Sequence, residues 1–514
     1  MSNSDEADIA LAGFSPFHKM ALLIVVCVGQ FLDTFSNSAL FSAIPPICVE
    51  LGISNSNSVW LQSGYQLTFA GLLLMSGRLS DLYNPKWVFI AGGLSLGIFS
   101  LAGGFVRSEV PLIALRALMG IGAALTVPSA LYLIVHMYPD PTSQSKAVGI
   151  FTMSGGLGNL LGLVIGALFV SFASWPWIFY FISILAISES VLVFIMCLNV
   201  KRSQMTATSH LKRLERLDVI GVTCFTASVI LFIFAVTSGS IEGWGSARVI
   251  ACLILSFVLL GIFSVYETYI PTWIAVIPPQ TWTYTNLPIL IATALLPYLW
   301  WGAVQSLYSW YWQEIFGWSA IITAVHFLPL GLSAVPAAGI ATMLQQYFPL
   351  KWVLMIGSVL SIIGSLLFPF GNSHSRYWSF VFPGFIIGSG GMSIVYVTAN
   401  VALFASTTPE VAGVVSAIFN AAIQLGCAAG IAIATSIQTS IQNRSGDPSS
   451  YEGRAAAFWF VLAVTATIGA LIAVLMKNNL PAMGQREQSQ KERALETLEE
   501  KQEQHSSSII TATI

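Results

Sequence analysis

The sequence predicts an all-α polytopic membrane protein. Three observations lead to this fold class: the composition, a series of apolar segments, and the distribution of basic residues. The chain has 514 residues, of which 55% are hydrophobic and only 9% are charged. A soluble globular domain carries about 25% charged residues. Most of the surface is therefore expected to face lipid rather than water.

Apolar segments long enough to cross a bilayer recur along the whole chain. A membrane-spanning helix needs about 20 mostly apolar residues. About fourteen segments meet this test, at residues 20–47, 58–77, 87–106, 111–136, 146–172, 176–199, 218–238, 247–268, 286–312, 319–344, 351–371, 378–404, 411–440 and 455–476. The segment 269–285 is broken by prolines, which predicts an interfacial connection rather than a span.

The basic residues predict the orientation of these helices, because cytoplasmic loops of membrane proteins are rich in Lys and Arg. With both termini in the cytoplasm, fifteen of the 21 basic residues lie on the inner side and five on the outer side, and Arg116 lies within the membrane. The sequon that begins at Asn443 then lies outside, where it is a candidate for glycosylation.

Other features argue against several functional classes. The formal net charge of -2 gives no indication of a nucleic-acid partner. The six cysteines lie in apolar segments without metal-ligand spacing. No phosphate-binding loop or nucleophile–base arrangement is found, so we expect neither an enzyme nor a bound cofactor or metal.

An internal repeat relates the two ends of the chain. At a shift of 268 residues, Gly120, Gly122, Gly158 and Gly162 fall on Gly388, Gly390, Gly426 and Gly430. At a shift of 265 residues, the Lys-Trp-Val at 86–88 falls on the one at 351–353. Both matches relate helices that are eight apart, which predicts two six-helix halves separated by two inserted helices.

Asp33 and Arg116 are the main candidates among the charged residues within predicted spans of the first half. Asp33, in the LDTFSNSAL segment of the first span, is near mid-helix, where a shielded carboxyl group can bind and release a proton. Its alternative is a structural acid that stays protonated. Arg116, in RALMGIG, is expected to face the protein interior or a wet cavity. Its alternative is a side chain that extends to the membrane interface.

Glycines and a charged loop complete the candidate motifs of the first half. Gly120 and Gly122, and Gly158, Gly162 and Gly166 on the fifth span, are expected to allow close helix packing. Residues 77–86 read GRLSDLYNPK. In this segment Gly77 would permit the close approach of a neighbouring helix. Together with Gly77, the charged residues Arg78, Asp81 and Lys86 would form a gating loop. An ordinary positively charged inner loop is the alternative.

These four segments resemble motifs of the major facilitator superfamily, and the fourteen spans resemble its drug:proton antiporter branch of that size. The loop is similar to that of fungal relatives of aminotriazole-resistance, boron-export and low-affinity ammonium transporters. Asn84-Pro85 replaces the usual Gly-Arg of the loop, and Leu163 replaces the usual proline of the glycine motif. The resemblance implies the major facilitator fold, proton coupling through Asp33 and Arg116, and export from a fungal cell across its plasma membrane.

Other polar residues are weaker candidates. Glu189 lies within the sixth span and is a possible second proton site. Polar and aromatic side chains that could line a substrate cavity are Asn37, Gln62, Tyr65, Gln66, Gln305, Tyr308 and Trp312. The last three share one face of the ninth span at helical spacing.

The sequence thus divides into a cytoplasmic N-terminal tail, a six-helix half, a cytoplasmic linker, two inserted helices, an interfacial connection, a second six-helix half and a cytoplasmic C-terminal tail, at residues 1–19, 20–199, 200–217, 218–268, 269–285, 286–476 and 477–514. We expect a monomeric, proton-coupled exporter of small organic compounds that works in a lipid bilayer. An importer of a small solute such as ammonium, and a nutrient sensor that does not transport, are the alternatives.

Overall fold

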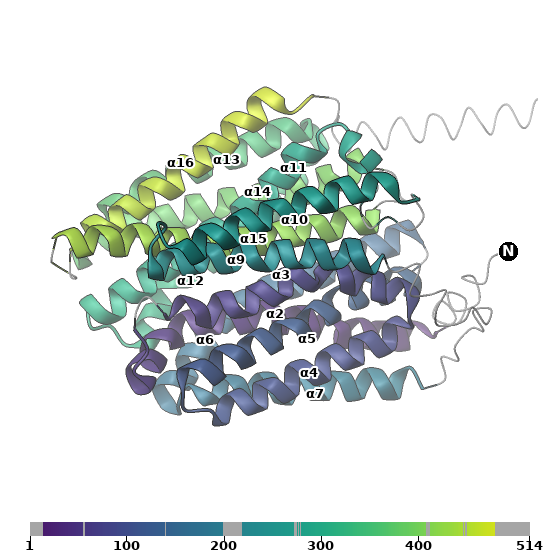
Figure 1. Cartoon of the computed structure of the whole chain (residues 1–514), viewed down its shortest axis with the longest axis horizontal. Coiled ribbons are helices and arrows are strands. Elements are labelled where there is room, and N and C mark those ends of the chain that lie inside the picture. The colour runs from purple at the N-terminus through teal and green to yellow at the C-terminus, as the bar shows by residue number, and fades with distance from the viewer. Residues whose placement is uncertain are drawn as a thin grey trace, which may run out of the picture.

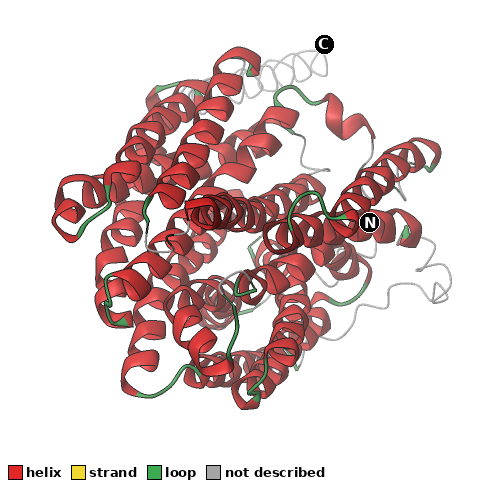
Figure 2. Ribbon diagram, turned by 60° about the vertical axis from the view of Figure 1, so that its left-hand side comes forward, coloured by secondary structure: helices red, strands yellow, loops and turns green. Residues whose placement is uncertain are grey.

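The computed structural model describes residues 14–54, 57–138, 140–198, 218–271, 275, 277, 279–407, 412–445, 447 and 450–478. Within these ranges every regular element is a helix (Figure 2). The predicted linker 200–217 and most of the two predicted tails lie outside the described residues. The prediction of an all-α protein is confirmed.

Each of the first six predicted spans corresponds to one α-helix. These helices are α2 (Pro16–Leu51), α3 (Val59–Leu82), α4 (Pro85–Phe105), α5 (Glu109–Met137), α6 (Pro141–Phe172) and α7 (Pro176–Met196). Several begin with proline at the first or second helical position. Proline is suited to a helix start because its missing N–H would have no partner there.

The remaining eight predicted spans also correspond to α-helices. They are α9 (Val219–Glu242), α10 (Ala247–Tyr269), α11 (Leu287–Trp310), α12 (Ala320–Tyr347), α13 (Leu350–Leu367), α14 (Phe382–Ser406), α15 (Ala412–Ser445) and α16 (Glu452–Leu475). Short π-helical turns cover Tyr311–Ile315 and Tyr377–Val381, and 3-10 turns cover Pro279–Thr283, Phe368–Phe370 and His374–Arg376. The described ranges therefore contain fourteen α-helices, as the sequence predicts.

Thirteen of the described helices are long and apolar enough to cross a membrane, and α3 is the exception. Its hydropathy is lowered by polar side chains such as Gln62 and Gln66. Both glutamines are buried within the protein. Since α3 packs against α5, α9 and α15, its polar residues are shielded from lipid by other helices.

The unusual Asn84-Pro85 of the charged loop has a structural role. The Asn84 side chain accepts a hydrogen bond of 3.1 Å from the backbone N–H of Lys86, and Pro85 is the first residue of α4. Asparagine is a favoured helix N-cap, and proline is favoured at the position that follows it. These two residues therefore start α4 where the family motif has glycine and arginine.

The helix contacts of the first half recur in the second half. In the first half α2 packs against α6, and α4 packs against α5 and α7. In the second half α11 packs against α15, and α13 against α14 and α16, which are the same pairs eight helices later. The pairs α3–α15 and α6–α12 join the two halves. The fold is thus two six-helix halves with two inserted helices.

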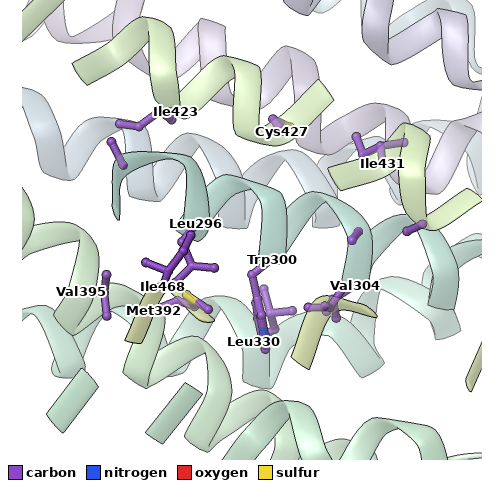
Figure 3. Packing of buried hydrophobic residues seen from close by; sticks show 14 of the residues in the cluster. Leu296, Trp300, Val304, Leu330, Met392, Val395, Ile423, Cys427, Ile431 and Ile468 are labelled. Carbon is purple, nitrogen blue, oxygen red and sulfur yellow. The ribbon is translucent and has the colours of Figure 1, made fainter. Parts of the chain in front are cut away.

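The inserted helices lie along one side of the bundle. α9 packs against α3 of the first half and α15 of the second half, and α10 packs mainly against α9 (Figure 1). Each half also has its own large hydrophobic core. In the second core Trp300 of α11 packs among Leu296, Leu330 and Met392 (Figure 3). Its indole N–H donates to the Ser365 hydroxyl at 2.7 Å, so the buried polar atom is satisfied.

Two lysines in repeated positions cap the last helix of each half. The Lys86 ammonium donates to the carbonyl of Cys197, the C-cap residue of α7. The Lys351 ammonium donates to the carbonyl of Met476, the C-cap residue of α16, at 2.8 Å. A cation is favourable at the negative end of a helix dipole. The shared Lys-Trp-Val therefore marks a helix-capping contact that occurs once in each half.

Candidate functional site

A central cavity lies between the two halves. It is lined from α2, α3, α6, α11 and α15 by Asp33, Thr34, Asn37, Ser38, Phe41, Gln66, Asn159, Tyr298, Trp301, Gly302, Gln305 and Cys427. Among these described lining residues, Asp33 is the only side chain that belongs to the acidic or basic amino acids. The cavity therefore combines amides, hydroxyls and a single carboxyl group with a larger share of aromatic and other apolar surface.

Asp33 is held in place by a tyrosine from the neighbouring helix. The Tyr65 hydroxyl of α3 donates to Asp33 Oδ1 at 2.7 Å, and both side chains are buried. One turn further along α2, the Asn37 amide donates to the backbone carbonyl of Asp33 at 3.0 Å. These contacts orient the carboxyl group at the wall of the cavity.

Arg116 lies behind this tyrosine and is completely buried. Its guanidinium donates to the Leu61 carbonyl at 2.9 Å and to the Ser36 hydroxyl at 2.7 Å. The guanidinium carbon lies 4.6 Å from the centre of the Tyr65 ring, a cation–π arrangement. The side chain thus faces the protein interior and does not extend to the membrane interface. Asp33, Tyr65 and Arg116 form one connected chain of contacts, which we call the acid–tyrosine–arginine chain.

Glu189 lies elsewhere in the first half. This residue of α7 is buried, and neither carboxyl oxygen has a hydrogen-bond partner among the described residues. A side-chain carbon added at Gly93 of α4 would lie 3.2 Å from its Oε1. Glu189 does not line the central cavity. The two carboxyl groups that the sequence offers as proton sites are therefore in separate environments.

The polar candidates for the cavity form a network around Asn37. Gln62 donates to the Asn37 backbone carbonyl and Gln66 donates to its side-chain carbonyl, each at 3.2 Å. Gln66 lines the cavity, and Gln305 lines it from the opposite half. Gln62 and Tyr65 stand behind the wall and support the residues that form it.

The aromatic candidates Tyr308 and Trp312 do not line the cavity. Their rings stack with centroids 4.9 Å apart, and both contact Phe385 in the core of the second half. The expectation that they share the cavity face with Gln305 is therefore wrong. α11 is enclosed by protein on several sides, so helical spacing alone does not reveal which face borders the cavity.

Several lining residues escaped the sequence analysis although their spacing offers a signal. Tyr298 and Trp301 precede the predicted Gln305 on α11, at intervals of three and four residues. The rings of Tyr298 and Trp301 are 5.7 Å apart. Phe41 follows Asp33 by two turns of α2. A search for residues in helical register with each polar candidate would have found Tyr298, Trp301 and Phe41.

The five glycines predicted to allow close packing lie against neighbouring helices. A side-chain carbon at Gly162 would lie 2.9 Å from the Phe35 carbonyl, and one at Gly166 would lie 2.7 Å from the Ala39 carbonyl. The other three also meet neighbouring helices: Gly158 meets α2, Gly120 meets α3 and Gly122 meets α4. Gly77 is different, because nothing lies within 4 Å of the corresponding position. It does not provide the close approach expected of it.

The remaining loop residues are only partly described. The Arg78 guanidinium donates to the Ala275 carbonyl in the connection after α10, which ties the inserted helices to the loop. Lys86 caps α7. The side chains of Asp81 and Asn443 lie outside the described part of the chain. A gating role for the loop and glycosylation of Asn443 therefore stay predictions.

Two repeated six-helix halves around a central cavity are the plan of one large class of secondary membrane transporters. The model of the Major Facilitator Superfamily matches residues 26–431. The chain belongs to the major facilitator superfamily.

Known proteins with similar sequence or structure agree with this assignment. A major facilitator superfamily multidrug transporter of Aspergillus fumigatus is 28% identical over 426 residues, which cover 80% of this chain and 78% of that protein. A low affinity ammonium transporter of Saccharomyces cerevisiae is 23% identical, with 80% of each protein covered. A bacterial homologue of the lysosomal transporter Spinster, in an inward-facing and occupied conformation, is similar in structure. Its TM-score is 0.62 at 12% identity, over 90% of this chain and 97% of that one.

Proposed function

We propose that this chain is a proton-coupled secondary transporter that exports a small organic compound by alternating access. The observation that carries the proposal is the position of Asp33. Its carboxyl group borders the cavity and accepts a hydrogen bond from Tyr65, whose ring lies against Arg116. One ionisable group thus borders the substrate space on one side and is linked through Tyr65 to a buried guanidinium on the other.

Proton coupling follows from competition for this carboxyl group. As a carboxylate, Asp33 accepts the Tyr65 hydrogen bond and can attract a donor group of the substrate. A proton that binds Asp33 removes the negative charge and weakens that attraction, so the substrate is released. Arg116 supplies a constant positive charge behind the tyrosine and positions the ring.

The driving force is adequate for such an exchange. Moving one elementary charge through 100 mV releases about 2.3 kcal/mol. Since a tenfold concentration ratio corresponds to about 1.4 kcal/mol, one proton exchanged for a neutral compound supports a gradient of more than tenfold.

The cavity lining favours a neutral or cationic compound that carries hydrogen-bond donors. The described lining offers a carboxyl group, amides and hydroxyls but no Lys, Arg or His, which disfavours an anion. Tyr298 and Trp301 provide an aromatic wall for an apolar or cationic part.

The direction of transport is supported by relatives rather than by the cavity. The Aspergillus fumigatus relative is called a multidrug transporter, which supports export. The Saccharomyces cerevisiae relative is called an ammonium transporter, which keeps import of a small solute as the second candidate. We further propose a plasma-membrane location with both termini in the cytoplasm, a monomeric state, a supporting proton site at Glu189, gating by the 77–86 loop and a glycan on Asn443.

Accumulation measurements in cells distinguish export from import. We would compare uptake of a fluorescent lipophilic cation by yeast cells that express the wild type, Asp33→Asn or the control Glu452→Gln, which changes an exposed acid outside the cavity. Export predicts lower dye content in wild-type and control cells than in cells with an empty vector. Asp33→Asn or a protonophore should abolish the difference. Higher dye content in wild-type cells would instead establish import.

A further inference from the structure

Two adjacent prolines interrupt the hydrogen bonding of α2 near its C-terminal end. Pro45 and Pro46 lie inside the helix and have no backbone N–H. In an α-helix the N–H of residue i bonds to the carbonyl of residue i−4. The carbonyls of Phe41 and Ser42 therefore have no such donor within α2. A buried carbonyl without a partner is costly, so these two need donors from elsewhere.

Those donors come from the opposite half of the protein. The Ser309 hydroxyl of α11 donates to the carbonyl of Phe41. The Gln313 amide, one turn further, donates to the carbonyl of Ser42 at 3.4 Å and to the Ser309 hydroxyl at 3.2 Å. The two unsatisfied carbonyls of α2 are thus met by a side chain of α11 and by one of the π-helical turn Tyr311–Ile315 that follows it.

The contact lies directly beyond the cavity. Phe41 lines the cavity from α2, and Gln305 lines it one turn before Ser309 on α11. Ser42 and Ser309 are both buried. The side chains also interlock there, since Phe41 belongs to the hydrophobic core of the second half and Trp310 packs against that of the first half. At this end the two halves are closed against each other.

α6 and α12 provide a further contact between the two halves. Side-chain carbons added at Gly149 and Gly156 of α6, or at Gly339 of α12, would meet nothing within 4 Å. The direct contact of α6 with α12 lies instead nearer the closed end, where Leu160 meets Gly331.

We propose that Ser309 and Gln313 form a latch that holds this end of the cavity closed, and that Pro45 and Pro46 create its two acceptors. The proposal rests on alternating access. The latch opens when the halves separate at this end, and its two carbonyls then become available to water. This makes the closed state dependent on hydrogen bonds that α2 cannot form within itself. The predicted topology places the latch on the extracellular side.

Accessibility of a cavity cysteine tests the latch without any transport measurement. Cys427 lines the cavity, and the other five cysteines would be replaced by alanine. The rate at which a membrane-impermeant maleimide labels Cys427 would be measured in sealed vesicles of each orientation. A separate variant with Ser54→Cys, at an exposed position after α2, identifies the side on which the latch lies.

In this background the combined change Ser309→Ala and Gln313→Leu should raise labelling from the latch side about tenfold. That factor corresponds to about 1.4 kcal/mol, at the low end of the cost expected for the three hydrogen bonds that the two changes remove. The matched control is Ser264→Ala, which removes a hydroxyl that bonds only within its own helix at an exposed position of α10. An unchanged rate in the latch variant, or an equal increase in the control, would refute the latch.

A second comparison tests whether Pro45 and Pro46 create the two carbonyl acceptors of the latch. Pro45→Ala with Pro46→Ala restores two N–H groups, so α2 can satisfy its own carbonyls. Labelling should again rise, and the addition of Ser309→Ala to this variant should have little further effect, because the two changes remove one shared interaction. Fully additive effects would contradict the role of the prolines. Ser309→Thr keeps the hydroxyl, so Cys427 of this variant should be labelled at the rate of the parent. This variant tests the hydrogen bond of Ser309 if the proline variants fold poorly.

Discussion

Replacement of Gly162 by alanine tests the helix packing that positions Asp33. Gly162 of α6 faces α2, and the added methyl group would lie 2.9 Å from the Phe35 carbonyl and 3.1 Å from the Ala39 backbone nitrogen. Backbone atoms cannot rotate away, so the two helices must separate. Overpacking of this kind costs typically 1–3 kcal/mol. We therefore expect Gly162→Ala to lower the free energy of unfolding by about 2 kcal/mol.

Gly156 of the same helix supplies the matched control. Nothing lies within 4 Å of the corresponding position at Gly156. Alanine there removes the entropic disadvantage of glycine in a helix and should stabilise the protein by about 0.5–1 kcal/mol. Thermal unfolding of the purified protein in detergent, followed by tryptophan fluorescence, measures both variants. Shifts of the melting temperature in the same direction and of similar size would refute the packing account.

Three further outcomes follow from the described contacts. Tyr65→Phe removes the hydrogen bond to Asp33 but keeps the ring, so transport should fall while the melting temperature changes little. Arg116→Lys cannot reproduce the bonds to both Leu61 and Ser36, so proton-coupled transport should fall at least tenfold, as tracer flux in vesicles would show. Lys351→Met removes a charged donor from the end of α16 and should cost about 1.5–3 kcal/mol in unfolding experiments. A transport-competent Arg116→Lys, or an unchanged stability of Lys351→Met, would contradict these assignments.

The helices and their order could be predicted from the sequence because the membrane imposes one rule on every span. A run of about 20 apolar residues is needed each time, and the Lys-Trp-Val repeat identified the eight-helix step between the halves. α3 was predicted although it is the least apolar of the described helices. Its polar residues were taken as cavity candidates, and Gln66 indeed lines the cavity.

Asp33 and Arg116 were found because charges are rare within spans, but their connection through Tyr65 was not predicted. That connection depends on how α2, α3 and α5 meet, and helical spacing describes only one helix at a time. The misplaced Tyr308 and Trp312 show the same limit. Both faces of α11 are buried, so apolar character does not separate the cavity face from the core face.

Two pairs of residues in the sequence, Asn84-Pro85 and Pro45-Pro46, have structural roles that the sequence analysis did not assign to them. Asn84-Pro85 was considered a departure from a charged motif, whereas it is a helix cap followed by a favoured proline. The loss of N–H groups at Pro45 and Pro46 predicts unsatisfied carbonyls four residues earlier. Only the three-dimensional structure reveals that the donors come from the other half.

Substrate-dependent proton entry into proteoliposomes tests the central claim most directly. The purified wild type and Asp33→Asn would be reconstituted with an internal pH dye, under an inward proton gradient. Candidate amphiphilic cations would be placed inside, with empty liposomes as the control for passive permeation. Proton-coupled export predicts that at least one compound accelerates proton entry for the wild type and not for Asp33→Asn. Equal acceleration by Asp33→Asn would contradict the assignment of Asp33 as the coupling site and direct attention to Glu189.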